Sequence, residues 1–121
     1  NRLSVALIRN KAGKFIEPTL ASTTAAVAGS AAALAKDVRN PIANSAAPDA
    51  YPIAGLTFLL VYQDSKDAAR AKALAEFIGW AIHDGQDMVE SLDYARLPEG
   101  VVKVDEATLR TLTAGGKKVM P

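Results

Sequence analysis

The chain has 121 residues, and its 14 Lys and Arg side chains nearly balance its 13 Asp and Glu side chains. It has no cysteine, which excludes disulfides and thiolate metal sites. The near-neutral charge, with no basic stripe interleaved with aromatic residues, argues against a nucleic-acid partner. Half of the residues are hydrophobic, but many are alanine and only one Trp, three Tyr and three Phe are present, so a lone domain of this length would have a thin core.

Neither end of the chain suggests a membrane or targeting segment. No apolar run approaches the roughly 20 residues that span a bilayer. The opening Asn1-Arg2-Leu3 has no initiator Met and leads into no apolar signal region. We therefore expect the chain to be a piece of something longer.

The first third predicts an edge hairpin followed by a helix. Residues 4–9 and 15–17 are apolar extended runs around a polar Asn/Gly turn. Thr19 or Ser22 can then cap an Ala-rich helix that runs to about Val38. Gly29 lies in its interior at a cost of about 1 kcal/mol relative to Ala. Residues 39–52 contain three prolines and predict a long loop, either a ligand lid or, as we favour, a connector between lobes.

The chain is organised around the apolar run Leu56 to Tyr62. It does not alternate with charge and contains Thr, Phe, Val and Tyr, with Pro52 and Gly55 before it. A helix is the competing interpretation of a short apolar run, but this composition favours a strand. A strand apolar on successive residues needs cover on both faces. We therefore predict a central strand of a helix-flanked sheet, and so an α/β fold.

The second half predicts three helices. The first is capped by Asp64 or Ser65 and ends near Asp84, with Gly85 in the left-handed position after it. Its predicted core-facing stripe is Leu74, Phe77, Ile78, Ala81 and Ile82.

A short helix follows over residues 86–92, with Met88, Val89 and Leu92 on one side. Tyr94 and Leu97 are then expected to tuck inward. The last helix should begin near Val101 or Asp105 and end at Gly115-Gly116, before a frayed tail.

The residues that could carry chemistry form no catalytic constellation, and we predict no enzyme, no metal site and no cofactor. His83, the only histidine, is interpreted as a favourable partner of a helix C-terminus rather than as a base or ligand. Asp84, Asp87 and Glu90 lack the spacing of a calcium loop and are interpreted as a solvated face. Trp80 and Tyr94 are interpreted as packing residues, although they could stack a ligand. The segment 115–118 (Gly-Gly-Lys-Lys) lacks the spacing of a phosphate loop.

Four segments in order resemble a known family. They are the opening with Glu17-Pro18-Thr19, the lead-in and strand over 49–58, the Phe-x-x-Trp helix over 76–81, and Leu-Asp-Tyr-Ala-Arg-Leu-Pro over 92–98. Together they resemble the C-terminal third of the phosphate-binding proteins that serve phosphate-specific ABC transporters. The resemblance covers nearly the whole chain.

The resemblance implies a class II periplasmic binding-protein fold with two lobes, located in the periplasm or outside the cell. Residues 1–54 would belong to the second lobe and residues 55–121 to the first, with a hinge-crossing strand near 55–62. In the family, phosphate lies between the lobes and is bound by helix N-termini, hydroxyl groups, an Arg and a carboxylate. This mixture suits an anion that still carries a proton.

The chain departs from the family's binding motifs. It has no Arg followed by Ser-Gly-Thr and no Gly-rich turn that opens a helix. We therefore expect no ligand-binding residue here, and expect this chain to supply scaffold and hinge. Its implied partners are phosphate, the N-terminal remainder of the protein, possibly as a separate chain, and the transporter's membrane subunits. The alternatives are a binding protein for another oxyanion, such as sulfate, molybdate or tungstate, and a non-catalytic structural or interaction domain.

Overall fold

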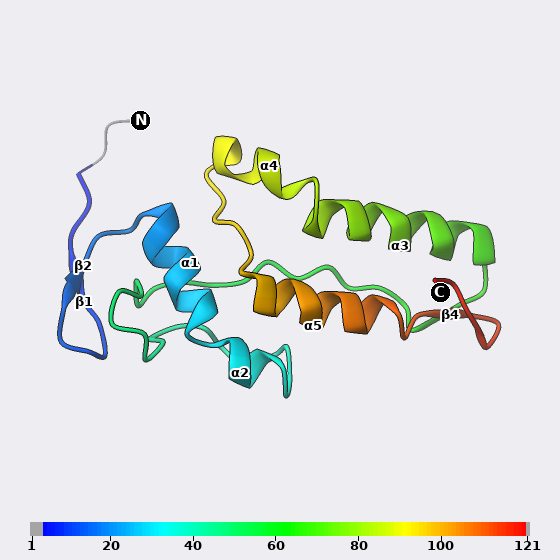
Figure 1. Ribbon diagram of the computed structural model, residues 1–121, viewed down its shortest axis with the longest axis horizontal. Coiled ribbons are helices and arrows are strands. Elements are labelled where there is room, and N and C mark those ends of the chain that lie inside the picture. The colour runs from blue at the N-terminus through cyan, green and yellow to red at the C-terminus, as the bar shows by residue number, and fades with distance from the viewer. Residues whose placement is uncertain (1–3, 121) are drawn as a thin grey trace.

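The computed structural model describes residues 4–120 as a mixed α/β arrangement of helices and small sheets (Figure 1). The predicted edge hairpin is confirmed: β1 (Ile8–Arg9) pairs antiparallel with β2 (Phe15–Ile16). Asn10 begins the turn and is buried. Its Nδ2 donates hydrogen bonds to the carbonyls of Pro48 at 2.9 Å and Ala50 at 3.1 Å, which ties the hairpin to the loop before residue 51.

The predicted Ala-rich helix is interrupted, so the prediction of one helix to Val38 is wrong. Its start is confirmed, because Thr19 and Ser22 form a capping box over the first turn of α1 (Leu20–Ala28). A second short helix, α2 (Ala31–Leu34), follows after Gly29. A Cβ at Gly29 would lie 2.4 Å from Ser45 Oγ and 2.6 Å from the Cβ of Ala47. Gly29 therefore permits the proline-rich loop to pack against the junction of the two helices.

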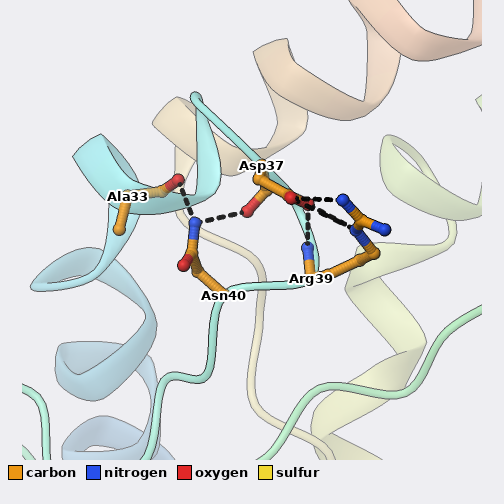
Figure 2. Close-up of polar contacts among 4 residues, drawn as sticks. All are labelled: Ala33, Asp37, Arg39 and Asn40. Atoms are coloured by element: carbon orange, nitrogen blue, oxygen red, sulfur yellow. Dashed lines mark hydrogen bonds and ion pairs between the residues drawn. The ribbon is translucent and has the colours of Figure 1, made fainter.

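The end of α2 is closed by polar contacts (Figure 2). Asn40 Nδ2 donates to the carbonyls of Ala33 and Asp37, each at 2.9 Å. Both carbonyls also accept hydrogen bonds from backbone amides, so the Asn40 side chain reinforces a turn that the backbone already closes. The guanidinium and amide N–H groups of Arg39 donate to the Asp37 carboxylate, and they lower the pKa of Asp37 to about 2.

Residues 53–62, which we call the unpaired segment, form no strand, so the predicted hydrogen-bonded strand over Leu56–Tyr62 is wrong for this chain. Within residues 4–120, no backbone N–H or C=O of the unpaired segment makes a hydrogen bond to another residue. Figure 1 shows it running alongside α5 (Glu99–Leu109). A strand exists only when a neighbouring strand completes its ladder, and no described segment lies at the required position.

Helix α3 (Ala68–Ile82) confirms the predicted amphipathic helix but not its start or its face. Asp67 caps it by accepting a hydrogen bond from the Arg70 amide, so Asp64 and Ser65 are not its cap. The buried face consists of Ala75, Ile78 and Ile82. The prediction that Leu74 and Phe77 belong to this face is wrong: they are 41% and 57% exposed. The helical repeat turns Phe77 away from the buried face and leaves Leu74 at its edge.

The short helix is confirmed as α4 (Gln86–Val89), which continues as the 3-10 turn η1 (Glu90–Leu92). Gly85 before it has φ −61°, so its predicted left-handed conformation is wrong. Glycine is needed there for space, since a Cβ would lie 2.9 Å from the Cα of Ala81. Leu97 packs inward as expected, whereas Tyr94 is 60% exposed, contrary to the prediction.

The end of the chain is a small sheet rather than a frayed tail. Helix α5 begins at Glu99, earlier than predicted, and ends well before Gly115. The strand β4 (Thr113–Ala114) then pairs parallel with β3 (Asp64–Ser65) and antiparallel with β5 (Lys117–Lys118). Gly115 and Gly116, at φ 57° and 75°, form the turn between β4 and β5. Pro121 of the predicted tail lies outside the described residues.

Two hydrophobic clusters meet at α5. The first holds Val27, Leu34, Ile42 and Val101, and the second holds Ala75, Ile78, Ile82, Leu109 and Leu112. Leu97 packs against both clusters. The unpaired segment also contributes to both, with Leu56 in the first and Val61 in the second. The helices therefore pack on one another through α5 rather than on the two faces of a sheet.

Candidate functional site

The most unusual surface of this chain surrounds the unpaired segment. Leu60 is 96% exposed and Tyr62 is 88% exposed, and Phe58 and Leu59 are more than half exposed. This segment combines backbone groups that make no hydrogen bond to residues 4–120 with large apolar side chains. Unpaired strand-like backbone is a template for pairing with another strand, and a contiguous apolar patch marks an interaction surface.

An apolar cleft lies between the unpaired segment, α3 and α5. Its volume is about 420 Å³. Its walls come mostly from aliphatic side chains, among them Leu56, Leu59, Val61, Ile78, Ile82, Leu97, Val101, Val104 and Leu109. Gln86 also lines it, and both ends of its amide are used: Nε2 donates to the Ala81 carbonyl and Oε1 accepts from the Leu97 amide.

Asp105 is the only charged residue that lines this cleft. It lies on α5 one turn after Val101 and one turn before Leu109, both buried. Its side chain makes no hydrogen bond or ion pair with any residue between 4 and 120. Burial among apolar side chains raises the pKa of Asp105, because desolvation disfavours the carboxylate. Asp105 was not singled out as a functional residue from the sequence. The signal was an acidic residue four positions from each of two apolar residues, Val101 and Leu109, on the same helix.

A second apolar surface, the outer face of α3, lies opposite the buried stripe. Phe77 and Trp80 stack there with ring centroids 5.9 Å apart. Leu74 adjoins them along the helix, and all three are more than 40% exposed. Trp80, expected to pack in a core or between lobes, stacks on Phe77 and is 43% exposed within this chain. A helix with apolar residues on opposite sides is typical of the interior of a larger protein.

The other polar residues singled out in the sequence lie apart from the cleft and pair locally. His83 Nε2 lies 2.9 Å from Glu106 Oε1, so the last turn of α3 contacts α5. Asp87 and Glu90 both accept hydrogen bonds of 3.0 Å from Arg96, which raises the pKa of Arg96. Asp84 is exposed.

The described residues contain no group of three His, Cys, Asp or Glu side chains placed to hold a metal ion. In the segment 115–118, Gly115 and Gly116 form a hairpin turn, and the two lysines form the exposed strand β5.

The cationic side chains with partners are each bound to a nearby carboxylate rather than converging on one point. Lys14 pairs with Asp49 at 2.9 Å, and Lys103 pairs with Glu99 one turn away on α5. Arg39 pairs with Asp37 (Figure 2). Between residues 4 and 120, no helix is both long enough and apolar enough to cross a bilayer.

Comparison with known proteins identifies a class: the chain is similar in sequence to phosphate-binding proteins. The relatives are phosphate-binding proteins named PstS. That of Xylella fastidiosa (strain 9a5c) is 35% identical over 107 residues, covering 88% of this chain and 29% of the relative. Those of Methanocaldococcus jannaschii and Pasteurella multocida are 32% and 30% identical, over 85% and 92% of this chain.

This similarity confirms the resemblance predicted from the sequence motifs. The chain spans only about 30% of the length of these relatives, since the matched shares are 29% to 32%. No protein-family model matches the chain.

Proposed function

We propose that these residues are part of an extracytoplasmic solute-binding protein that captures inorganic phosphate for an ABC importer. The observation that carries this proposal is the similarity over 88% of the chain to a phosphate-binding protein. The residues described here act without catalysis, and the importer's membrane subunits are the partners to which the loaded protein delivers its ligand. The protein works in the periplasm or outside the cell.

The proposed architecture is a two-lobed, class II periplasmic binding-protein fold. Residues 1–54 form part of the second lobe, and residues 55–121 form the C-terminal part of the first. The buried residues of the second cluster all come from residues 55–121, whereas the first cluster combines Val27, Leu34 and Ile42 with Val101 of α5, so the two parts are in contact along α5. The unpaired segment contributes Leu56 to one cluster and Val61 to the other, as a chain crossing between lobes would.

The remainder of the protein covers the apolar surfaces that this chain exposes. Phe58, Leu60 and Tyr62 on the unpaired segment and Phe77 on α3 would then be buried. Hydrogen-bonded strands alongside the unpaired segment would satisfy its backbone groups. The remainder lies on the same polypeptide or on a separate chain.

Phosphate contacts come mainly from that remainder. Binding a hydrated oxyanion needs several donors that converge and replace water. Here Arg39 and Arg96 are committed to carboxylates, and an exposed ion pair contributes less than about 1 kcal/mol. The role of this chain is to build the hinge and wall on which the lobes close.

Titration calorimetry on residues 1–121, on the remainder and on their mixture tests the proposal. We expect the chain alone to bind anions weakly and without selectivity. We expect the mixture to bind phosphate with higher affinity than sulfate or molybdate. Tight phosphate binding by residues 1–121 alone would overturn the scaffold role. A mixture that prefers sulfate or molybdate would reassign the ligand, and one that binds no oxyanion would favour a structural or interaction domain.

A further inference from the structure

We propose that the remainder of the protein inserts a Lys or Arg side chain into the apolar cleft, where it pairs with Asp105. This inference rests on the proposed function, because it takes the remainder as the occupant of the cleft. It assigns to Asp105 a docking role that neither the sequence motifs nor the names of the relatives contain. The residues that form three walls of the cleft support the inference.

The first wall is α5 itself. Asp105 shares the face of α5 that carries buried Val101 and Leu109, so its side chain is partly buried and lines the apolar cleft while its carboxylate still reaches solvent. The exposed acidic residue Glu99 on the same helix has a partner: the Nζ of Lys103 lies within hydrogen-bond distance of the Glu99 Oε1. Asp105 has no such partner within residues 4–120.

The second wall is α3 with the start of α4, and it offers Asp105 no charge. The residues of these helices that line the cleft are Ile78, Ala81, Ile82 and Gln86. The amide of Gln86 is committed to the backbone of Ala81 and Leu97. Leu34 and Val38, which line the cleft from the side of α2, are apolar as well. A cation for Asp105 must therefore come from outside these elements.

The third wall is the unpaired segment, which identifies the occupant. Leu56, Thr57, Phe58, Leu59 and Val61 line the cleft, and their backbone groups have no hydrogen-bond partners in the described part of the chain. A strand that pairs with this segment would direct alternate side chains to the side of the cleft. In the relatives, the chain outside the matched region is more than twice as long as the matched region itself, which is enough to supply such a strand.

A basic residue fits this position for a physical reason. When the occupant excludes water, an unpaired carboxylate among apolar groups becomes costly. A Lys or Arg side chain covers apolar walls with its methylene stem and brings its charge to the carboxylate. The pair also fixes the register of the occupant, because a shift by one residue would turn the cation away.

The test is a carbon-13 NMR titration of aspartate carboxylates in the complete protein that contains these residues, with the Asp105 signal assigned through Asp105→Asn. Pairing predicts a midpoint below that of an exposed aspartate. A midpoint above it means that Asp105 stays unpaired and overturns the proposal. Light scattering on the same sample must show a monomer; a lowered midpoint seen only in a dimer assigns the cleft to a second copy and also overturns it.

A stability measurement provides an independent readout. Asp105→Leu in the complete protein should lower the folding equilibrium constant about tenfold or more, because it leaves the incoming cation buried and unpaired. Asp84→Leu, a control at an exposed position, should change it by no more than about twofold. An unchanged or increased constant for Asp105→Leu overturns the proposal.

Phosphate titration of the same unmodified sample separates the two ideas. A lowered Asp105 midpoint without phosphate binding supports the ion pair and contradicts the proposed function. Phosphate binding with a raised midpoint supports the function and overturns the ion pair.

Discussion

Phe77 and Trp80 lie against each other on the exposed side of α3, with ring centroids 5.9 Å apart and planes inclined by 31°. Ile78, between them in the sequence, points the other way and is only 8% exposed. Helix α3 thus carries apolar side chains on two opposite sides, and only one of them is covered by α5 and its neighbours. The uncovered side is a surface over which the remainder of the protein would pack under the proposed function.

The two sides of α3 give the first prediction. Ile78→Ala in the complete protein should cost about 2–5 kcal/mol, because it removes methyl and methylene groups from a packed cluster. Lys72→Ala, whose side chain is 65% exposed, should cost under about 0.5 kcal/mol. Urea midpoints report both values. Equal shifts for the two variants would contradict the assignment of the buried face.

The outer face of α3 gives the second prediction. Trp80 is the only tryptophan of the chain, so 5-fluorotryptophan incorporated into residues 1–121 reports on this face alone. Addition of unlabelled remainder should shift the fluorine resonance and shield it from a soluble paramagnetic probe. Phe77→Ala should weaken this association. A resonance that stays accessible in a phosphate-binding mixture would show that the outer face of α3 is not an interface.

The junction of α1 and α2 gives the third prediction. Gly29→Ala should destabilise the complete protein by about 1–3 kcal/mol, since the added methyl group overlaps Ser45 Oγ and Ala47 Cβ. Gly100→Ala is the matched control on α5: its Cβ would meet only the Cβ of Ala31 at 3.7 Å, an ordinary contact. The control should stabilise by up to about 1 kcal/mol through helix propensity. If Gly29→Ala were also stabilising, the close packing of the loop would be refuted.

The unpaired segment gives the fourth prediction. Residues 1–121 expressed alone should aggregate or fold poorly, because Leu60 and Tyr62 expose apolar surface beside unpaired backbone. The double substitution Leu60→Lys and Tyr62→Lys should increase the monomer fraction in size-exclusion chromatography with light scattering. The same change should weaken association with the remainder. A cooperative thermal transition of the unmodified, monomeric chain would count against this prediction.

The C-terminal sheet gives the fifth prediction. Asp64 accepts hydrogen bonds from Thr113 Oγ1 at 2.6 Å and from the Gly116 amide at 3.0 Å, and these bonds lower the pKa of Asp64. A carboxyl whose pKa is lower in the folded state stabilises that state above its unfolded pKa, and this stabilisation is lost as the pH falls through the folded value.

The protection of the Gly116 amide against exchange, relative to the same amide in an unfolded chain, should therefore fall in acid below the ordinary aspartate range. Asp64→Ala should produce this loss of protection at neutral pH. Asp64→Asn, which keeps an acceptor oxygen, should preserve most of the protection at every pH. Exchange that is the same in all three proteins would show that Asp64 does not hold the turn.

The local sequence determined several elements because their causes lie within a few residues. The Asn10 turn produces the β1–β2 hairpin, the Thr19 and Ser22 hydroxyls start α1, and the apolar spacing of residues 74–82 indicates α3. Turn chemistry and capping need no distant partner. The motif over residues 92–98 likewise indicated the resemblance to phosphate-binding proteins before any fold was considered.

Other features were decided by contacts between residues far apart in the chain. The break at Gly29 depends on the approach of Ser45, and the small sheet depends on Gln63 to Ser65 meeting residues 113–115. Which apolar side of α3 is buried depends on where α5 lies, and the single stripe predicted from periodicity was therefore displaced from the face that is buried. The run Leu56–Tyr62 has the composition of a central strand, but a strand requires hydrogen-bonding neighbours, and these must come from elsewhere in the complete fold because the described residues do not supply them.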